Sequence, residues 1–247
     1  MRTAYLVVAL AGLLPAPVLS QTLEQRIAVV GDGTVRLSFA ARAGVCRDGV
    51  HQFGDKQASD EWEPDCERQL VRVALRVRGG VPAAVRTYVG GRWRAGSSAH
   101  DLGTVGAEAA ASYFMRLAGQ SRGVSGDPVL PATLADSAVI WPSLLALARA
   151  EHVPHERRRS AVFWLGQAAG ESIAGALDSI ALDESGNRDI RKHAVFALSQ
   201  RSTDEAVPAL IRIARTNRDP ELRRTALFWL GQSEDPRALN LFEELLR

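Results

Sequence analysis

The side chains that could carry out acid–base or metal chemistry are few and far apart in this sequence. His152 and His155 lie three residues apart on either side of Pro154, which is the nearest approach to a pair of metal ligands. We interpret them as solvated histidines of a turn, because a structural zinc ion needs four clustered ligands. His51, His100 and Asp101 could meet in the folded chain, but nothing in their spacing requires it.

Motifs that would identify an enzyme are also missing from the sequence. It contains no phosphate-binding loop, no dinucleotide fingerprint, no Gly-x-Ser-x-Gly elbow and no His-Glu-x-x-His. We therefore expect no catalytic residue, no metal ion and no cofactor. The alternative is an enzyme with its site where the N-terminal region meets the first helices, which would have to draw on His51, His100 or Asp101.

Two cysteines, Cys46 and Cys66, are the only ones in the chain. In an oxidising compartment two such residues most simply form a disulfide, and closing a loop of about 20 residues contributes roughly 3 kcal/mol by loop-entropy arguments. The alternatives are two free thiols or half of a metal site, although the close Cys-x-x-Cys spacing of zinc sites is absent.

The first twenty residues are typical of an export signal. Arg2 gives a short basic start, an apolar run extends from Tyr5 to Leu14, and small or compact residues precede Gln21, where cleavage is predicted. The alternative is a buried N-terminal helix or a retained membrane anchor. No cysteine follows the predicted cut to accept a lipid. We expect a bacterial periplasmic or secreted protein without stable membrane insertion after cleavage.

The second half of the chain contains an internal repeat. One string recurs at offsets of 33 and 32 residues, over residues 157–167, 190–200 and 222–232, and a second recurs in the same phase over 141–149, 174–182, 207–215 and, in degraded form, 239–247. In the first string, Ala161 and Leu165 and their copies lie four residues apart on one helical face. The pattern predicts units of two helices stacked in a row.

Three sets of repeat positions are candidates for binding a partner. The sets are an arginine ladder, a glutamine ladder and two tryptophans: Arg158, Arg191, Arg223; Gln167, Gln200, Gln232; Trp164, Trp229. The arginines could pair with Glu171, Asp204 and Asp235 of adjacent units or bind an acidic partner. The glutamines could hydrogen-bond the connection to the next helix or contact a ligand. We expect the tryptophans, with Phe163, Phe196 and Phe228, to be mostly core, whereas an exposed tryptophan would indicate a binding face.

These units resemble the short HEAT-like repeats of phycobilisome-lyase-type and related scaffold proteins. Asp219, Pro220, Glu221, Arg223 and Ala226 match the Asp-Pro-Glu-x-Arg-x-x-Ala motif that opens the first helix of such a unit, and Val207, Pro208 and Leu210 match the Val-Pro-x-Leu motif of the second. The resemblance covers about residues 139–247. It implies a right-handed α-solenoid that recognises a protein on its concave side. Phe-Trp-Leu-Gly-Gln in place of the usual Ala-Leu-Gly-x-Leu is a departure from the family pattern.

The N-terminal region has the two-residue period of β-strands. Val35, Leu37 and Phe39 alternate with polar residues, as do the valines and leucine between 71 and 77, which predicts half-buried strands with one wetted face. Glycine pairs at 31–33 and 79–80 predict hairpins. We expect residues 47–65 to be a surface loop, residues 95–101 a linker, and residues 106–118 a helix capped by Thr104.

The predicted fold is α+β: a signal peptide over residues 1–20, a small β-rich domain over 21–100, and a HEAT-like α-solenoid over 104–247. The net charge of +2 is too small to indicate nucleic acid or an anionic membrane as the partner. We therefore expect an exported, non-enzymatic scaffold or adaptor that binds a protein. A lyase-like enzyme, and nucleic-acid binding by the solenoid arginines, are the alternatives.

Overall fold

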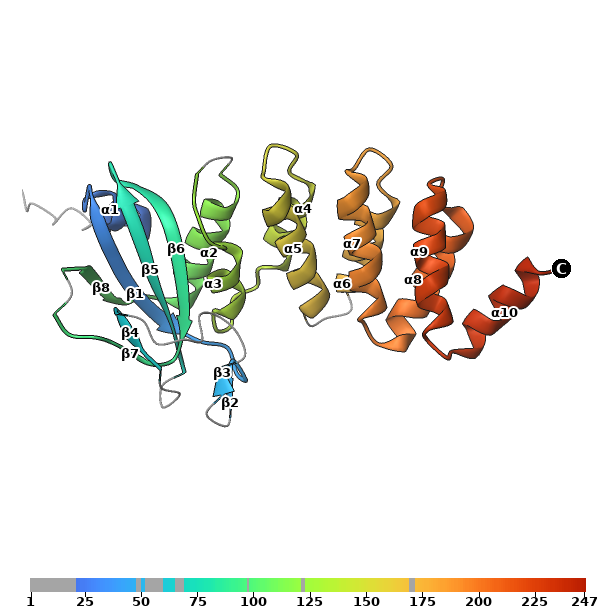
Figure 1. Cartoon of the computed structure of the whole chain (residues 1–247), viewed down its shortest axis with the longest axis horizontal. Helices are drawn as coiled ribbons and strands as arrows, with labels where there is room; N and C mark the ends of the chain where they lie inside the picture. Colours follow the sequence, from blue (N-terminus) through green and yellow to red (C-terminus); the bar gives the residue numbers. More distant parts are fainter. Residues whose placement is uncertain are drawn as a thin grey trace, which may run out of the picture.

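The computed structural model describes residues 21–47, 50–51, 60–64, 69–96, 98–120, 123–168 and 172–247. A sheet and its covering helices form one end of the molecule, and a row of helices extends from it to the C-terminus (Figure 1). The predicted α+β organisation is confirmed. The predicted signal peptide and Cys66 lie outside the described residues, so the pairing of Cys46 with Cys66 stays a prediction.

Four strands form the main sheet, in the order β6-β5-β1-β8. β1 (Gly33–Ala40), β5 (Leu70–Arg78) and β6 (Val81–Val89) are antiparallel neighbours, and β8 (His100–Thr104) runs parallel to β1. The β5–β6 hairpin turns at Gly79 and Gly80, whose φ angles of 55° and 76° suit glycine. The hairpin predicted there is confirmed.

The hairpin predicted at residues 31–33 is wrong, because the run before it is helical. α1 (Leu23–Ala28) begins with a capping box in which Thr22 and Gln25 satisfy each other's backbone amides. Leu23 and Ile27, four residues apart, are its buried positions. This local capping favours a helical turn over a strand.

Both faces of the sheet are covered, which corrects the expectation of one wetted face. Val35, Leu37 and Phe39 of β1 pack in the core shared with α2 (Ala107–Ala118), and Phe39 lies 6.2 Å from Phe114 between ring centroids. The opposite face is covered by the ladder of β4 (Trp62–Glu63) and β7 (Arg92–Trp93). Trp62, within the expected surface loop, is fully buried.

Several shorter elements also differ from the predictions. The expected linker ends in strand β8, and Gly106 rather than Thr104 is the N-cap of α2. α3 (Val129–Leu134) follows α2, and at the start of the expected surface loop β2 (Cys46–Arg47) pairs with β3 (Val50–His51).

Seven helices follow in the repeat region, and each lies on one of the recurring strings. They are α4 (Trp141–Arg149), α5 (His155–Gln167), α6 (Ser172–Leu182), α7 (Arg188–Ser199), α8 (Thr203–Thr216), α9 (Pro220–Gly231) and α10 (Pro236–Leu245). Asp219 is the N-cap of α9, at the start of the motif that opens this helix, and Asn187 is the N-cap of α7. No helix in the described part of the chain is long and apolar enough to cross a membrane.

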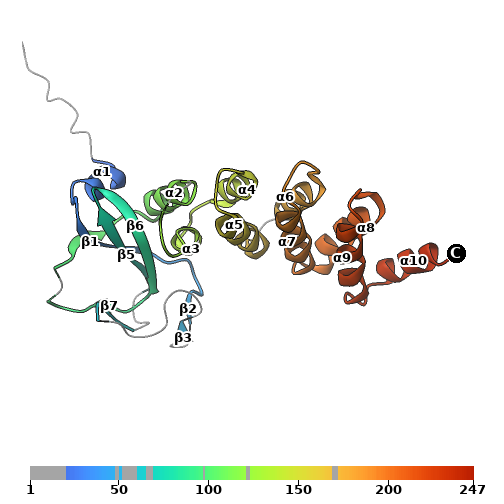
Figure 2. The same ribbon diagram turned by 45° about the horizontal axis from the view of Figure 1, so that its top comes forward.

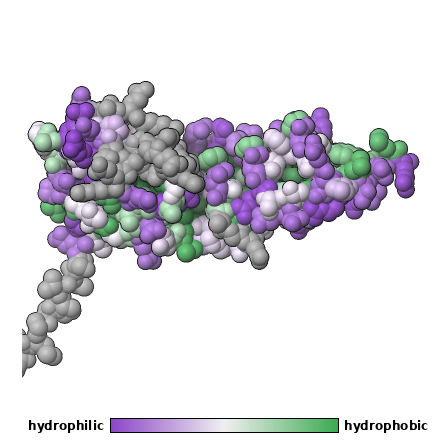
Figure 3. All heavy atoms as spheres, turned by 90° about the horizontal axis from the view of Figure 1, so that it is seen from below, coloured by the Kyte–Doolittle hydropathy of each residue, from purple (hydrophilic) through white to green (hydrophobic). Residues whose placement is uncertain are grey.

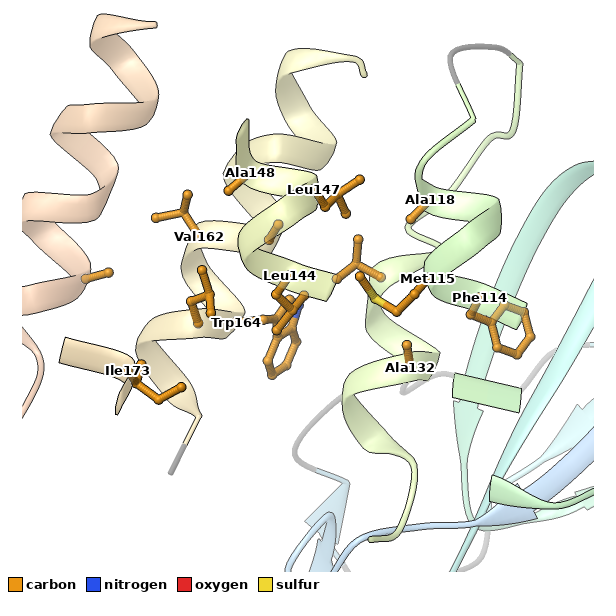
Figure 4. Close-up of a cluster of buried hydrophobic side chains, with 14 of the residues drawn as sticks. Phe114, Met115, Ala118, Ala132, Leu144, Leu147, Ala148, Val162, Trp164 and Ile173 are labelled. Carbon is orange, nitrogen blue, oxygen red and sulfur yellow. The ribbon is translucent and has the colours of Figure 1, made fainter. Parts of the chain in front are cut away.

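The closest hairpins are α4 with α5, α6 with α7 and α8 with α9. The Val-Pro-x-Leu helix is therefore the first helix of each hairpin, one helix out of register with the predicted order. α5, α7 and α9 lie on one side of the row and α4, α6 and α8 on the other (Figure 2). The core is continuous: side chains of α2, α3, α4, α5 and α6 pack together where the sheet region meets the first hairpin (Figure 4).

α5 and α7 approach closely at Gly166. A Cβ added there would lie 3.0 Å from the Cβ of Ala197, so a larger residue would push the two helices apart. Ala161 and Ala194 are fully buried at the positions where the sequence predicted close packing.

Candidate interaction surface

The arginine ladder is structural and largely buried. Arg158 donates from Nε to the carbonyl oxygen of Ala148 (3.0 Å), and Arg191 donates from Nε to that of Ala181 (3.2 Å). Both carbonyls lie in the last turn of the preceding helix, where intrahelical donors run out. Arg223 makes the equivalent bonds to the carbonyl oxygens of Asn217 (2.8 Å) and Arg218 (3.1 Å).

The expected pairing of these arginines with Asp204 and Asp235 is therefore wrong, and the pairing with Glu171 stays a prediction. Asp204 and Asp235 instead form ion pairs with Arg237 (3.3 and 2.8 Å), and the hydrogen bond from Arg237 holds the pKa of Asp235 below its ordinary value. Glu171 lies outside the described residues. Arg158 and Arg191, 7% and 6% exposed, are not available to a partner.

The phenylalanines next to the tryptophans are exposed, which corrects the expectation that they are core. Phe163, Phe196 and Phe228 are 46%, 40% and 58% exposed. Each lies two residues after a buried alanine of the ladder, about 200° around the helix, and so points away from the core. Trp164 is buried, and Trp229 is partly buried with its ring 5.4 Å from that of Phe196. The helical period alone could have identified this outward register.

The glutamine ladder shares the exposed side of the same helices. Gln167, Gln200 and Gln232 each follow a phenylalanine by four residues, which places them one turn further along the same face. All three are exposed. Gln200 donates to the hydroxyl of its neighbour Ser199 (3.2 Å), and none of the three binds a connection between helices in the described part of the chain. We call this side of α5, α7 and α9, with its phenylalanines and glutamines, the aromatic face.

Two further ladders, which the sequence reasoning missed, border the phenylalanines. Superposing the three copies aligns one set of acids and one set of bases: Glu156, Asp189, Glu221; Arg159, Lys192, Arg224. The three acids and three bases balance in number, and two ion pairs join them. Arg159 pairs with Glu156 (3.6 Å), and Lys192 pairs with Glu221 of the next hairpin, whose pKa this hydrogen bond and charge lower.

A hollow of about 730 Å³ opens on the aromatic face between α5 and α7. Phe163, Phe196, Trp164 and Leu130 give it an apolar lining. The loop before α3 forms one wall, where Asp127 accepts a hydrogen bond from the Ser160 hydroxyl (2.8 Å). A mostly apolar hollow with a few polar groups at its edge suits the side chains of a ligand.

Arg157 of α5 holds the loop before α3 in place through hydrogen bonds. Its guanidinium donates to the carbonyl oxygens of Gln120 (2.6 Å) and Val124 (3.1 Å), and burial lowers its pKa. The wall of the hollow is therefore held in place by α5.

His193 forms a bridge between hairpins at the edge of the hollow. Its Nε2 accepts a hydrogen bond from Nε of Arg159 (2.8 Å), so its Nδ1 carries the proton and donates to the carbonyl oxygen of Asp189 (2.8 Å). The side chain of His193 thus links α5 to α7.

The other histidines do not assemble a site. His155 lies 4.0 Å from Asp189, His152 is exposed at the edge of a different hollow, and His100 and Asp101 are exposed on β8. His51 pairs with Cys46 in the separate β2–β3 ladder. No group of three or more metal-ligating side chains occurs among the described residues.

The outer surface of the repeats is mainly hydrophilic, with scattered hydrophobic positions and a denser hydrophobic area at the C-terminal end (Figure 3). That end carries Leu239, Leu245 and Leu246, all exposed.

Comparison with known proteins identifies the repeats. A family model described as HEAT repeats matches residues 176–247, from α6 to the end of the chain. No curated protein matches the sequence. The C-terminal repeats are thus HEAT-like, they follow a strand-containing N-terminal region, and HEAT repeats generally mediate protein–protein interaction.

Proposed function

We propose that this HEAT-like repeat protein is a non-enzymatic scaffold that binds a partner protein on its aromatic face. The observation that carries the proposal is the exposure of Phe163, Phe196 and Phe228 at one register of three successive hairpins. Single exposed apolar residues are common, but aligned aromatic side chains on a charged surface are typical of binding sites.

The paired charges around the phenylalanines favour a protein over nucleic acid. Binding to phosphates requires unpaired arginines and lysines, whereas Arg159 and Lys192 already contact acidic side chains. In the arginine ladder, Arg158 and Arg191 donate to carbonyl oxygens at the ends of the preceding helices.

Export completes the proposal. The apolar run from Tyr5 to Leu14 and the compact residues before Gln21 support cleavage and release into the periplasm or medium, where Cys46 and Cys66 would form a disulfide. Mass spectrometry of the protein recovered from its host would show a mature chain that begins at Gln21 and is two mass units lighter than its reduced form. A chain with residues 1–20 intact, or with two free thiols, would contradict this part.

Site-specific crosslinking tests the binding proposal. A photoreactive phenylalanine analogue placed at Phe228 is expected to capture a partner in the native compartment, and the same analogue at Thr216, exposed on α8 on the other side of the row, is not. The captured protein would then be purified and titrated against the full chain.

Two triple variants each replace three exposed apolar residues, one set on the aromatic face and one set outside it. A triple Phe163→Ser, Phe196→Ser, Phe228→Ser variant is expected to weaken partner binding at least tenfold. The control is Val81→Ser, Val139→Ser, Leu239→Ser, whose side chains are 58%, 78% and 59% exposed away from the aromatic face. Equal capture at both crosslinking positions, or unchanged affinity of the phenylalanine variant, would overturn the proposal.

A further inference from the structure

We infer that the aromatic face binds a polypeptide segment in extended conformation that crosses α5, α7 and α9, carries a large apolar side chain at about every third residue, and has no net charge along the contact. This inference rests on the proposed function and specifies the partner's chemistry. Three independent features of the described residues carry it.

The first feature is the spacing of the phenylalanines. They recur once per hairpin on helices that pack side by side, and packed helices lie roughly 8–10 Å apart. An extended chain in the polyproline II conformation advances about 3.1 Å per residue and has three residues per turn, so three residues cover about one hairpin and positions i, i+3 and i+6 lie on one face. Apolar side chains at positions i, i+3 and i+6 of such a segment would meet Phe163, Phe196 and Phe228 in turn.

The second feature is the glutamine ladder. Each amide offers two donors and an acceptor oxygen, which matches the single N–H and C=O of each residue of an extended main chain. A bound helix has already satisfied its main-chain groups internally and would leave the glutamines without use. Gln167, Gln200 and Gln232 lie one turn beyond the phenylalanines, so a chain that contacts one ladder runs beside the other.

The third feature is the charge balance. Three acids and three bases balance in number beside the phenylalanines, and Arg159 with Glu156 and Lys192 with Glu221 form ion pairs. A strongly acidic or basic segment would have to break these pairs. A neutral segment would not.

The hollow between Phe163 and Phe196 sets one position apart from the others. Its volume of about 730 Å³ and its lining by Trp164 and Leu130 admit a side chain as large as tryptophan. We therefore expect an aromatic residue at this one position of the segment and smaller apolar residues at the others.

Selection from a random peptide library tests the inference. A displayed library of 12-residue peptides would be selected on the full chain, with counter-selection on the triple phenylalanine-to-serine variant. The enriched peptides are expected to show apolar residues with a three-residue period, one aromatic position and near-zero net charge.

One enriched peptide would then be measured by fluorescence anisotropy. A Gln167→Ala, Gln200→Ala, Gln232→Ala variant is expected to bind it about tenfold more weakly, and N-methylation of its central amides is expected to cost a similar factor. The control is Gln69→Ala, an exposed residue just before β5 and outside the aromatic face. Enriched peptides with a helical seven-residue period, a charged consensus or no consensus, or full affinity after N-methylation, would overturn the inference.

These outcomes separate the inference from the proposed function. A partner that crosslinks at Phe228 but binds through a helix would contradict the extended segment and leave the scaffold role standing. Absence of both a crosslinked partner and an enriched peptide would contradict both.

Discussion

The covered face of the sheet and the repeat region both bury arginines, but they accommodate them in different ways. In the sheet, Arg36 lies 4.7 Å from the ring of Trp93 and donates to the carbonyl oxygen of Glu61, while Arg72 donates to the carbonyl oxygen of Gly91 (2.7 Å). In the repeats, Arg158 and its copies all donate to carbonyl groups at or just after the end of the preceding helix.

The difference shows what repetition does to a buried charge. One solution, a guanidinium on the free carbonyls of a helix end, serves each hairpin because the geometry recurs. In the sheet each arginine needs its own partners from distant strands, such as the Glu61 carboxylate that also pairs with Arg86 (2.6 Å) and accepts from the Tyr88 hydroxyl (2.7 Å). The following variants would break or sharpen this comparison.

The largest effect is expected for Trp62→Ala. Trp62 is fully buried and stacks on Tyr88 at 4.9 Å, so its removal opens the cover of Arg36 and Arg72. We expect a loss of about 4 kcal/mol in the free energy of unfolding, measured by denaturant titration. Val81→Ala, exposed on the same sheet, should change it by less than about 0.5 kcal/mol. A small loss for Trp62→Ala would mean that this face is not an independent core.

Arg191→Met should have the next largest effect. It removes the charged donor to the Ala181 carbonyl oxygen and to Oδ1 of Asn217 (3.0 Å), a residue only 4% exposed, and leaves each buried acceptor with one neutral donor, Nδ2 of Asn217 and the backbone N–H of Asp219. A loss of about 3 kcal/mol is expected in the same titration. Arg223→Met, at the equivalent but half-buried position, should cost about 1 kcal/mol. Equal losses at the two positions would show that burial does not distinguish the copies.

Asp178→Asn should stabilise the protein at neutral pH by less than either preceding variant destabilises it. Burial raises the pKa of Asp178, and its pair with Arg212 (3.3 Å) offsets this only in part. Because the folded pKa lies above the unfolded value, ionisation costs stability as pH rises through the folded pKa. The variant's advantage should therefore be present at pH 7 and shrink towards pH 3. An advantage independent of pH would contradict the assignment.

Phe228→Ser should have the smallest effect on stability. The side chain is more than half exposed, so the free energy of unfolding should change by about 0.5 kcal/mol or less, although partner binding should weaken. Leu230→Ala, two residues along the same helix and 1% exposed, should cost about 3 kcal/mol. A large loss for Phe228→Ser would place it in the core rather than on the aromatic face.

The repeat helices could be predicted from the sequence because self-comparison supplies several copies of each one. Their bounds follow from caps such as Asp219-Pro220 and from the buried alanine positions. The hairpin register could not be predicted in the same way. A strictly alternating pair of helices looks alike whichever helix is taken first, and only the relative closeness of α8 to α9 decides it.

The covered sheet face and the aromatic face show two kinds of missed information. β4 and β7 are two residues each and pair across 30 residues of chain, so neither carries a periodic signal. The exposure of Phe163, by contrast, could have been predicted, because Phe163 lies two residues after the buried Ala161 and so points to the opposite side of the helix. The general expectation that aromatic residues are buried led to the wrong prediction.

The glycine at the closest approach of α5 and α7 gives the hollow a mechanical property. Gly166 meets Ala197 near the C-terminal ends of the two helices, and a hydrogen bond from Arg159 to His193 joins the helices further towards their N-termini. These two contacts together define the angle between α5 and α7. The hollow lies between the same two helices, so its width depends on that angle. A Gly166→Ala substitution would push α5 and α7 apart at Ala197 and so change the width of the hollow between them.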